Sequence, residues 1–160
     1  EMKSFLLEIT TDIFLKKDDK SDNRLVDMIL DKAGAKGTGK WTSQAALDLP
    51  EPIPTIDMAV MMRNISAMKE ERVMANNLYH RELKKINASK EDFIKQLHDA
   101  LLFATITSYA QGLSMLAKAS VLLKMQIPLS EVIRVWTGGG IIRSSLLNFF
   151  GKAFEKIDHL

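Results

Sequence analysis

The chain has 160 residues, a length at which one domain can bury a substantial hydrophobic core. Its net charge of +2 at pH 7 argues against a protein that binds nucleic acid or an anionic membrane, and the absence of cysteine excludes a disulfide framework. No signal peptide opens the sequence, and the longest apolar stretch, 100–123, is interrupted by polar residues, as is typical of a buried helix rather than a membrane span. We therefore expect a soluble, cytoplasmic protein.

Hydrophobic residues recur at helical spacing along almost the whole chain, which predicts an all-α, bundle-like fold without a sheet. We expect helices at 3–17, 22–33, 42–49, 55–82, 90–126, 129–136 and 141–156. The second of these ends at Gly34, in the position of a helix C′ glycine. Prolines 50, 52 and 54 then force an extended linker between the third and the fourth helix.

Two of the longer predicted helices have a distinctive composition. The helix at 55–82 has a stripe of methionines on its apolar side, which predicts adaptable core packing rather than a cofactor site. Ser89 followed by Asp92 is an N-cap pattern that starts the helix at 90–126, in which Gly112 predicts close packing against another helix. The chain opens inside a helical pattern and stops without a terminating feature, so we expect a fragment of a longer protein.

Residues 31–42, which read D-K-A-G-A-K-G-T-G-K-W-T, gather lysines, threonines and glycines between two predicted helices. Glycines let the backbone approach a ligand, and a helix that starts directly afterwards aims free N–H groups at the same point, a combination that suits a phosphate. One alternative is a nucleotide-binding P-loop, since Gly34, Gly39 and Lys40 fit the frame G-x-x-x-x-G-K. Against it, Trp41 replaces the Ser or Thr that holds magnesium, and the preceding residues are spaced as in a helix, not a strand.

The K-G-T-G-K-W-T part of this segment resembles the signature of the 6-phosphogluconate dehydrogenase family. Further blocks that resemble this family stand in the same order: F-L-L-E-I-T at 5–10, A-V-M-M-R at 59–63, K-E-E-R at 69–72, I-T-S-Y-A-Q-G at 106–112 and W-T-G-G-G-I-I-R-S at 136–144. The resemblance covers nearly the whole chain. It implies that 1–160 is a single helical domain, part of a C-terminal substrate-binding and dimerisation domain, without the family's N-terminal dinucleotide-binding domain and C-terminal tail.

Lys36 and Thr38 are the leading phosphate ligands in the segment. Their ammonium and hydroxyl groups stand at alternate positions, and the amides of Gly37 and Gly39 lie beside them. By resemblance, Lys36 and Thr38 match the residues that hold the 6-phosphate of the family's substrate. The alternative for Lys36 is a solvated loop lysine, and we expect Lys40, one position out of phase, at the surface.

Arg63 is the third candidate ligand. An arginine near the apolar face of a helix needs an anionic partner, and its planar guanidinium suits bidentate phosphate binding. By resemblance, Arg63 matches the family's phosphate-binding arginine. The alternative from the residues alone is an internal salt bridge with Glu70 or Asp57.

Other polar residues are predicted to have structural roles. Three glycines at 138–140 indicate tight helix packing at a turn, with an anion nest as the alternative. We expect Arg143 in a buried ion pair and Tyr109 and Gln111 in the core. The three histidines, His80, His98 and His159, stand at surface positions without metal-ligand spacing, so no metal site is predicted.

Three positions depart from the family's pattern. Ala35 replaces the usual Asn, Gln or Ser, which removes one loop hydrogen bond, worth about 0.5–1.5 kcal/mol net. Thr137 replaces a residue that is usually basic, and Gly139 one that is usually Cys. None of these is a phosphate ligand, and together they suggest a divergent bacterial branch of the family.

The resemblance implies oxidative decarboxylation of 6-phosphogluconate to ribulose 5-phosphate and CO2, with NADP and without a metal. The family's catalytic lysine and glutamate lie upstream of this chain, so no catalytic residue is assigned here and we expect the chain alone to be inactive. NADP is bound mainly by the N-terminal domain in this scheme, and the helical domain forms a homodimer. The alternative function is a non-catalytic helical dimerisation module, in which Lys36 and Arg63 lie far apart.

Overall fold

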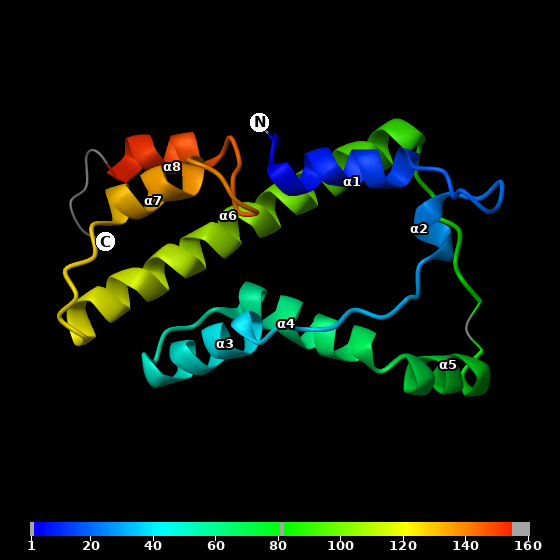
Figure 1. The fold of residues 1–160 in the computed structure, drawn as a ribbon, viewed down its shortest axis with the longest axis horizontal. Helices are drawn as coiled ribbons and strands as arrows, with labels where there is room; N and C mark the ends of the chain where they lie inside the picture. The colour runs from blue at the N-terminus through cyan, green and yellow to red at the C-terminus, as the bar shows by residue number, and fades with distance from the viewer. Residues whose placement is uncertain (1, 81, 155–160) are drawn as a thin grey trace. The chain divides into compact units, whose positions relative to one another are not determined.

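A computed structural model describes residues 2–80 and 82–154 of the chain. These residues form helices and contain no sheet, which confirms the all-α prediction (Figure 1). The helices are α1 (Phe5–Leu15), α2 (Leu25–Met28), α3 (Thr38–Asp48), α4 (Pro54–Ala67), α5 (Lys69–Leu78), α6 (Lys90–Leu122), α7 (Leu129–Thr137) and α8 (Leu147–Phe154).

The chain divides into two compact units. The terminal unit comprises the described residues of 1–30 and 116–160, and the central unit comprises those of 31–115. Helix α6 begins in the central unit and ends in the terminal unit.

The terminal unit is held together by backbone hydrogen bonds between its two chain segments. Phe5 N donates to Arg143 O at 3.0 Å, and Ser145 N donates to Lys3 O at 2.8 Å, on either side of an isolated bridge between Ser4 and Ser144. Helices α7 and α8 pack against one another. Their contact buries Ile133 and Leu147 almost completely, because both lie on the apolar faces of short amphipathic helices.

In the central unit, α6 supplies the cap that α4 lacks. No side chain of its own caps the start of α4. Instead, Gln111 Oε1 accepts hydrogen bonds from Thr55 N at 3.0 Å and Ile56 N at 3.3 Å, and its amide donates to Thr55 Oγ1. Two orphan N–H groups of the first turn are thereby satisfied. Tyr109 is buried, which confirms its predicted place in the core, whereas Gln111 is half-buried and forms its hydrogen bonds at the edge of the core.

Several helix boundaries differ from the prediction, four of them in ways that matter for the site or the packing. Helix α2 ends at Met28, since Ile29 is extended, and Gly34 therefore does not end a helix. Helix α3 starts at Thr38 instead of 42, while the last helix starts at 147 instead of 141. The long helix predicted at 55–82 is interrupted at Met68, whose ψ of 55° is not helical. The predicted N-cap is confirmed, because Asp92 N donates to Ser89 Oγ at 3.0 Å.

Apolar faces of α4 and α6 have little cover within this chain. The methionine stripe predicted to be core is about half exposed, at Met58 (60%), Met61 (54%), Met62 (54%) and Met68 (49%). Within the described residues, α6 is long and apolar enough to cross a membrane by length and composition, and only 11% of its 18-residue apolar window is buried. Apart from the neighbouring backbone of α6 itself, no atom of the described residues lies within 4 Å of a Cβ placed on Gly112. Within the described residues, this helix is therefore not buried and Gly112 does not pack closely against another helix, so both predictions are wrong for contacts within the chain.

Candidate functional site

The predicted phosphate-binding segment becomes an irregular loop followed by the start of α3. Gly37 is the residue before the helix and has a φ of +106°, a left-handed conformation that favours glycine. The ring of Trp41 lies against it, so that a Cβ at position 37 would stand 3.3 Å from Trp41 Cζ2. Lys36 thus stands immediately before the N-cap residue of α3, and Thr38 is the first helical residue.

This geometry does not fit a P-loop. A P-loop follows a β-strand, whereas the residues before Gly34 are irregular and follow the short helix α2. Trp41 instead packs on Gly37, and this contact fixes the turn into α3.

Two contacts fix the course of the segment relative to α4 within the central unit. At one end, Ala33 N donates to Ser66 Oγ at 3.2 Å. At the other, Gly39 packs so closely on α4 that a Cβ there would lie 3.0 Å from Val60 Cγ2. Arg63 is three residues from each of these α4 residues, about 4.5 Å along the helix axis from either. The stretch 33–39 therefore runs along the part of α4 that carries Arg63.

The three candidate ligands are accessible and unpaired within the described residues. Lys36, Thr38 and Arg63 are all exposed. The ion pairs among residues 2–80 and 82–154 include neither Lys36 nor Arg63. Asp57 instead accepts a hydrogen bond from Ser43 at 2.6 Å. An internal salt bridge of Arg63 with Glu70 or Asp57 is therefore not formed.

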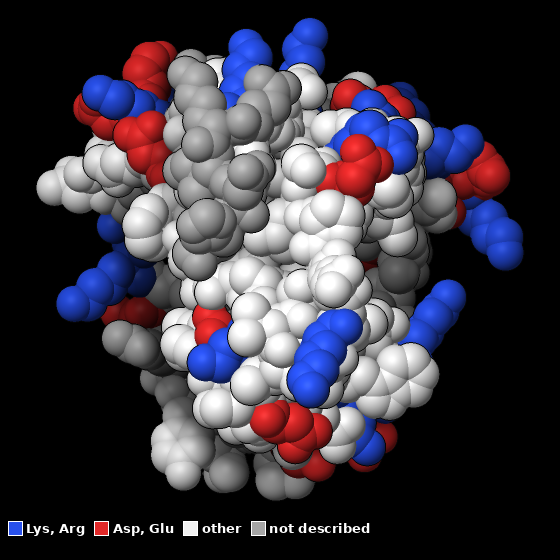
Figure 2. Space-filling view, turned by 90° about the vertical axis from the view of Figure 1, so that its left-hand side faces the viewer, with Lys and Arg blue, Asp and Glu red and all other residues white. Residues whose placement is uncertain are grey.

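The positive charge of the segment comes from individual side chains. On the face drawn in Figure 2, lysine and arginine side chains are interleaved with carboxylates rather than gathered in one basic patch. Neither Lys36 nor Arg63 has a carboxylate ion-pair partner in the described part of the chain, a property that they share with the other lysines there. The free N–H groups in the first turn of α3 add a favourable partial charge for an anion. Lys40 is exposed, as predicted.

Arg72, on α5, anchors the start of the same segment. Its Nη1 donates to Asp31 Oδ2 at 2.9 Å, and its Nη2 donates to the backbone oxygens of Asp31 at 2.8 Å and Ser66 at 3.1 Å. The hydrogen bond from Arg72, followed by its charge, holds the pKa of the Asp31 carboxyl below its usual value of 3.8. No role of Arg72 was predicted from the sequence. The available signal was its position in the K-E-E-R block, which has the appearance of an ordinary exposed charge run.

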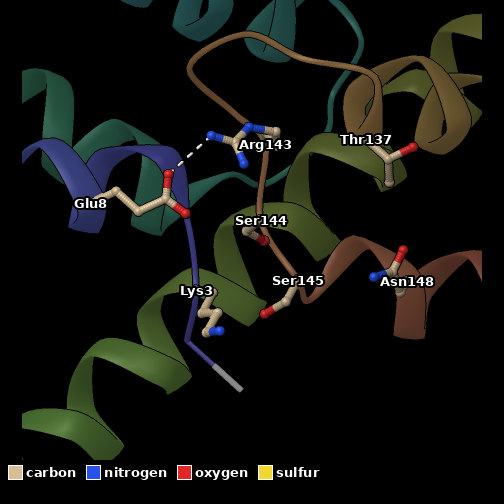
Figure 3. A pocket seen from close by; sticks show the side chains of 7 residues that line it. All are labelled: Lys3, Glu8, Thr137, Arg143, Ser144, Ser145 and Asn148. Carbon is tan, nitrogen blue, oxygen red and sulfur yellow. Dashed lines mark hydrogen bonds and ion pairs between the residues drawn. The ribbon is translucent and has the colours of Figure 1, made fainter.

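A second polar region lies in the terminal unit, around a cavity of about 280 Å³ (Figure 3). Arg143 Nη2 donates to Glu8 Oε2 at 3.1 Å, and the Arg143 guanidinium lies over the ring of Phe5 at 5.8 Å. The predicted ion pair of Arg143 is present, but it is partly exposed (41% and 54%) rather than buried. The cavity is lined by Lys3, Glu8, Thr137, Arg143, Ser144, Ser145 and Asn148.

The glycine block beside this cavity forms a turn. Gly139 and Gly140 have φ values of +149° and +85°, and a Cβ on either would have no neighbour within 4 Å. These glycines therefore supply backbone conformations that other residues rarely adopt, and the predicted tight packing at them is wrong.

The described histidines lie at the surface, as predicted. His80 is exposed, and His98 Nδ1 lies 3.0 Å from Asp99 Oδ1 with its side chain 45% exposed. His159 lies outside the described residues. Among residues 2–80 and 82–154, no group of three or more His, Cys, Asp or Glu side chains is arranged to hold a metal ion.

Comparisons with known proteins agree with the sequence resemblance. The family model described as "6-phosphogluconate dehydrogenase, C-terminal domain" matches residues 1–160. A Bacillus subtilis protein named NADP(+)-dependent, decarboxylating 6-phosphogluconate dehydrogenase is 46% identical over 157 residues, which are 98% of this chain and 34% of that protein. An Arabidopsis thaliana protein named decarboxylating 6-phosphogluconate dehydrogenase 2 is 40% identical over 161 residues, 98% of this chain and 33% of that protein.

A solved structure is also similar. It is that of Plasmodium falciparum 6-phosphogluconate dehydrogenase, described in its apo form, with its cofactor NADP+ and with its substrate 6-phosphogluconate. The TM-score is 0.90 at 42% sequence identity, and the match covers 98% of this chain and 34% of that one. The chain thus spans about a third of the length of these relatives.

Proposed function

Because the chain belongs to the 6-phosphogluconate dehydrogenase family, we propose that it is the helical substrate-binding domain of an enzyme that oxidatively decarboxylates 6-phosphogluconate with NADP. The products are ribulose 5-phosphate and CO2. The greater length of the relatives supports a complete enzyme in which a dinucleotide-binding domain precedes this chain and a tail follows it. We place this enzyme in the cytoplasm, in accordance with the resemblance.

The role proposed for the loop and α4 is to hold the substrate's 6-phosphate. Lys36 and Arg63 supply the charge and Thr38 a hydroxyl donor, while the backbone at Gly37 and Gly39 gives the anion access to the first turn of α3. The single observation that carries this proposal is the course of residues 33–39 along α4 beside Arg63, fixed by the Ala33–Ser66 and Gly39–Val60 contacts. The alternative dimerisation module has no need for two unneutralised cations in this arrangement.

The chain's own residues act by binding and orienting the substrate. Holding the remote phosphate places the reacting end of the sugar acid at a fixed distance, and binding energy spent there raises the rate only when the catalytic groups are also present. The catalytic lysine and glutamate lie outside this chain in the proposal, which makes the isolated chain inactive. The described residues contain no strand, glycine loop and helix unit that fits a dinucleotide, so NADP binding also belongs to the preceding domain.

A homodimer through the helical domain is part of the proposal. The half-exposed methionines of α4 and the largely unburied apolar window of α6 support it, since monomeric soluble proteins rarely leave such surfaces open. Sedimentation equilibrium of the complete protein tests this part, because a monomer at micromolar concentration contradicts it.

Steady-state kinetics of the complete enzyme test the phosphate assignment. Lys36→Met and Arg63→Met each remove one charge-assisted hydrogen bond, worth about 1.5–3 kcal/mol, so KM for 6-phosphogluconate rises by about 10- to 150-fold while KM for NADP changes little. Lys40→Met is the matched control, because it removes the same charge one turn along α3. Equal effects of Lys36→Met on both substrates contradict the assignment.

A further inference from the structure

We propose that Arg72 is a positioning residue that sets the affinity for the substrate's phosphate by holding the loop that carries Lys36. This inference rests on the phosphate site proposed above. Arg72 does not itself contact the phosphate in this proposal. Its contacts with Asp31 and Ser66 connect the start of the loop to the junction between α4 and α5.

Arg72 occupies this junction because α4 stops at Ala67. The non-helical ψ at Met68 leaves the last carbonyl groups of α4 without helical partners, and Arg72 Nη2 donates to one of them, Ser66 O, at 3.1 Å. The same Nη2 donates to Asp31 O at 2.8 Å. A single guanidinium group therefore joins the end of α4 to the backbone of the loop.

Two further contacts make the connection specific. The carboxylate of Asp31 accepts from Nη1 at 2.9 Å, which adds a charge-assisted hydrogen bond. Ser66, whose carbonyl Arg72 caps, also uses its hydroxyl to accept from Ala33 N at 3.2 Å. The loop is thus tied at Asp31 and Ala33, and three residues later the chain reaches Lys36.

Beyond these ties, the loop has little internal structure. Residues 31–36 are irregular, and the next fixed point is Gly37, at the start of α3. Lys36 is exposed and has no ion-pair partner within the described residues, so its position depends on the backbone at either side. Loss of the Arg72 contacts releases the tie at Asp31. A displaced Lys36 loses part of a charge-assisted hydrogen bond to the phosphate, whose complete loss weakens binding by about 10- to 150-fold.

Only an arginine provides all three bonds. Its planar fork directs separate N–H groups at Asp31 and Ser66, whereas a lysine ammonium is a compact point charge on a flexible stem. The Arg72 Nε is buried and has no hydrogen-bond partner within the described residues. Methionine at position 72 removes the three hydrogen bonds and so releases the start of the loop. Because it also removes the buried Nε, which is unfavourable without a partner, we expect only a small decrease in the free energy of unfolding.

The test compares Arg72→Met and Arg72→Lys in the complete enzyme. We expect Arg72→Met to raise KM for 6-phosphogluconate about tenfold, through a weakened charge-assisted hydrogen bond from Lys36. We expect kcat and KM for NADP to change less than twofold, and Arg72→Lys to recover part of the effect. Arg134→Met is the matched control, because Arg134 forms an exposed i,i+3 ion pair with Glu131 within the terminal unit and has no contact with residues 31–36. A parallel loss in kcat and both KM values together with a lowered melting temperature indicates a merely structural role and overturns the proposal.

A double-variant cycle separates this inference from the proposed function. If Arg72 acts through Lys36, Arg72→Met has little further effect on KM for 6-phosphogluconate in a Lys36→Met background. Fully additive effects overturn the positioning role. If Lys36→Met alone leaves KM for 6-phosphogluconate unchanged, the proposed phosphate site fails. If Lys36→Met raises KM but Arg72→Met does not, only the role of Arg72 fails.

Discussion

The close contact between α3 and α4 yields the sharpest prediction, Gly39→Ala. Carbon atoms pack at about 3.5–4.0 Å, but a Cβ at position 39 would lie 3.0 Å from Val60 Cγ2. The two helices must therefore separate by about 0.5–1 Å, or Val60 must leave its rotamer. Overpacking of this kind costs about 1–3 kcal/mol, and the better helix propensity of alanine recovers about 1 kcal/mol.

The displacement also acts on the proposed site. Moving the start of α3 away from α4 shifts Lys36 and Thr38 relative to Arg63. The weakened charge-assisted hydrogen bond to the phosphate then raises KM for 6-phosphogluconate by roughly tenfold. The assay is steady-state kinetics of the complete enzyme together with a melting curve. Gly34→Ala is the matched control, because nothing lies within 4 Å of a Cβ at that glycine.

A second substitution shows whether the contact itself is responsible. Val60→Ala removes Cγ2, so the double variant Gly39→Ala, Val60→Ala should regain most of the affinity for 6-phosphogluconate that Gly39→Ala loses. The reasoning is refuted if Gly39→Ala leaves KM for 6-phosphogluconate unchanged, or if Val60→Ala brings no recovery.

Two further predictions concern stability. Replacing Gln111 with Ala leaves two N–H groups at the start of α4 without their acceptor and lowers the free energy of unfolding by about 1–3 kcal/mol. Gln111→Glu, by contrast, retains an acceptor and most of the stability. Urea unfolding measures both variants, and equal losses contradict the capping role. Because the folded-state pKa of Asp31 lies below its usual value of 3.8, its ion pair with Arg72 stabilises the fold above that pH and is lost as the pH falls through the folded-state pKa. The melting temperature of Asp31→Asn is therefore lower than that of the unsubstituted chain at pH 7, with a deficit that shrinks below pH 3.8; a deficit independent of pH contradicts this.

The helices could be predicted from the sequence more reliably than their ends. Hydrophobic periodicity located α1, α6 and α7 because each presents a continuous pattern. The start of α3 was missed because it depends on a left-handed Gly37 and on the packing of the Trp41 ring on it, which the hydrophobic pattern does not show. The break at Met68 was missed for a similar reason, since the carbonyl it frees is satisfied by Arg72 from the next helix.

Burial could not be predicted from composition alone. A methionine stripe indicates a surface that packs against something, but the sequence does not tell whether the partner belongs to the same chain. The methionines of α4 are about half exposed, and no other part of the described chain covers them fully.

The candidate site was predicted in part. The resemblance singled out Lys36, Thr38 and Arg63, whereas no local pattern indicated that residues 33–39 run beside Arg63. That adjacency depends on contacts of Ser66 and Val60, which are ordinary helix residues in the sequence. The role of Arg72 was not predicted, because an arginine in a charged block gives no indication of the carbonyl groups to which it donates hydrogen bonds.

A crystal structure of the complete protein with bound 6-phosphogluconate tests the proposed phosphate site most directly. We expect the phosphate oxygens within about 2.7–3.2 Å of Lys36 Nζ, Thr38 Oγ1 and the Arg63 guanidinium, beside the first turn of α3. A phosphate bound elsewhere, with Lys36 and Arg63 directed into solvent, would contradict the assignment of these residues as phosphate ligands.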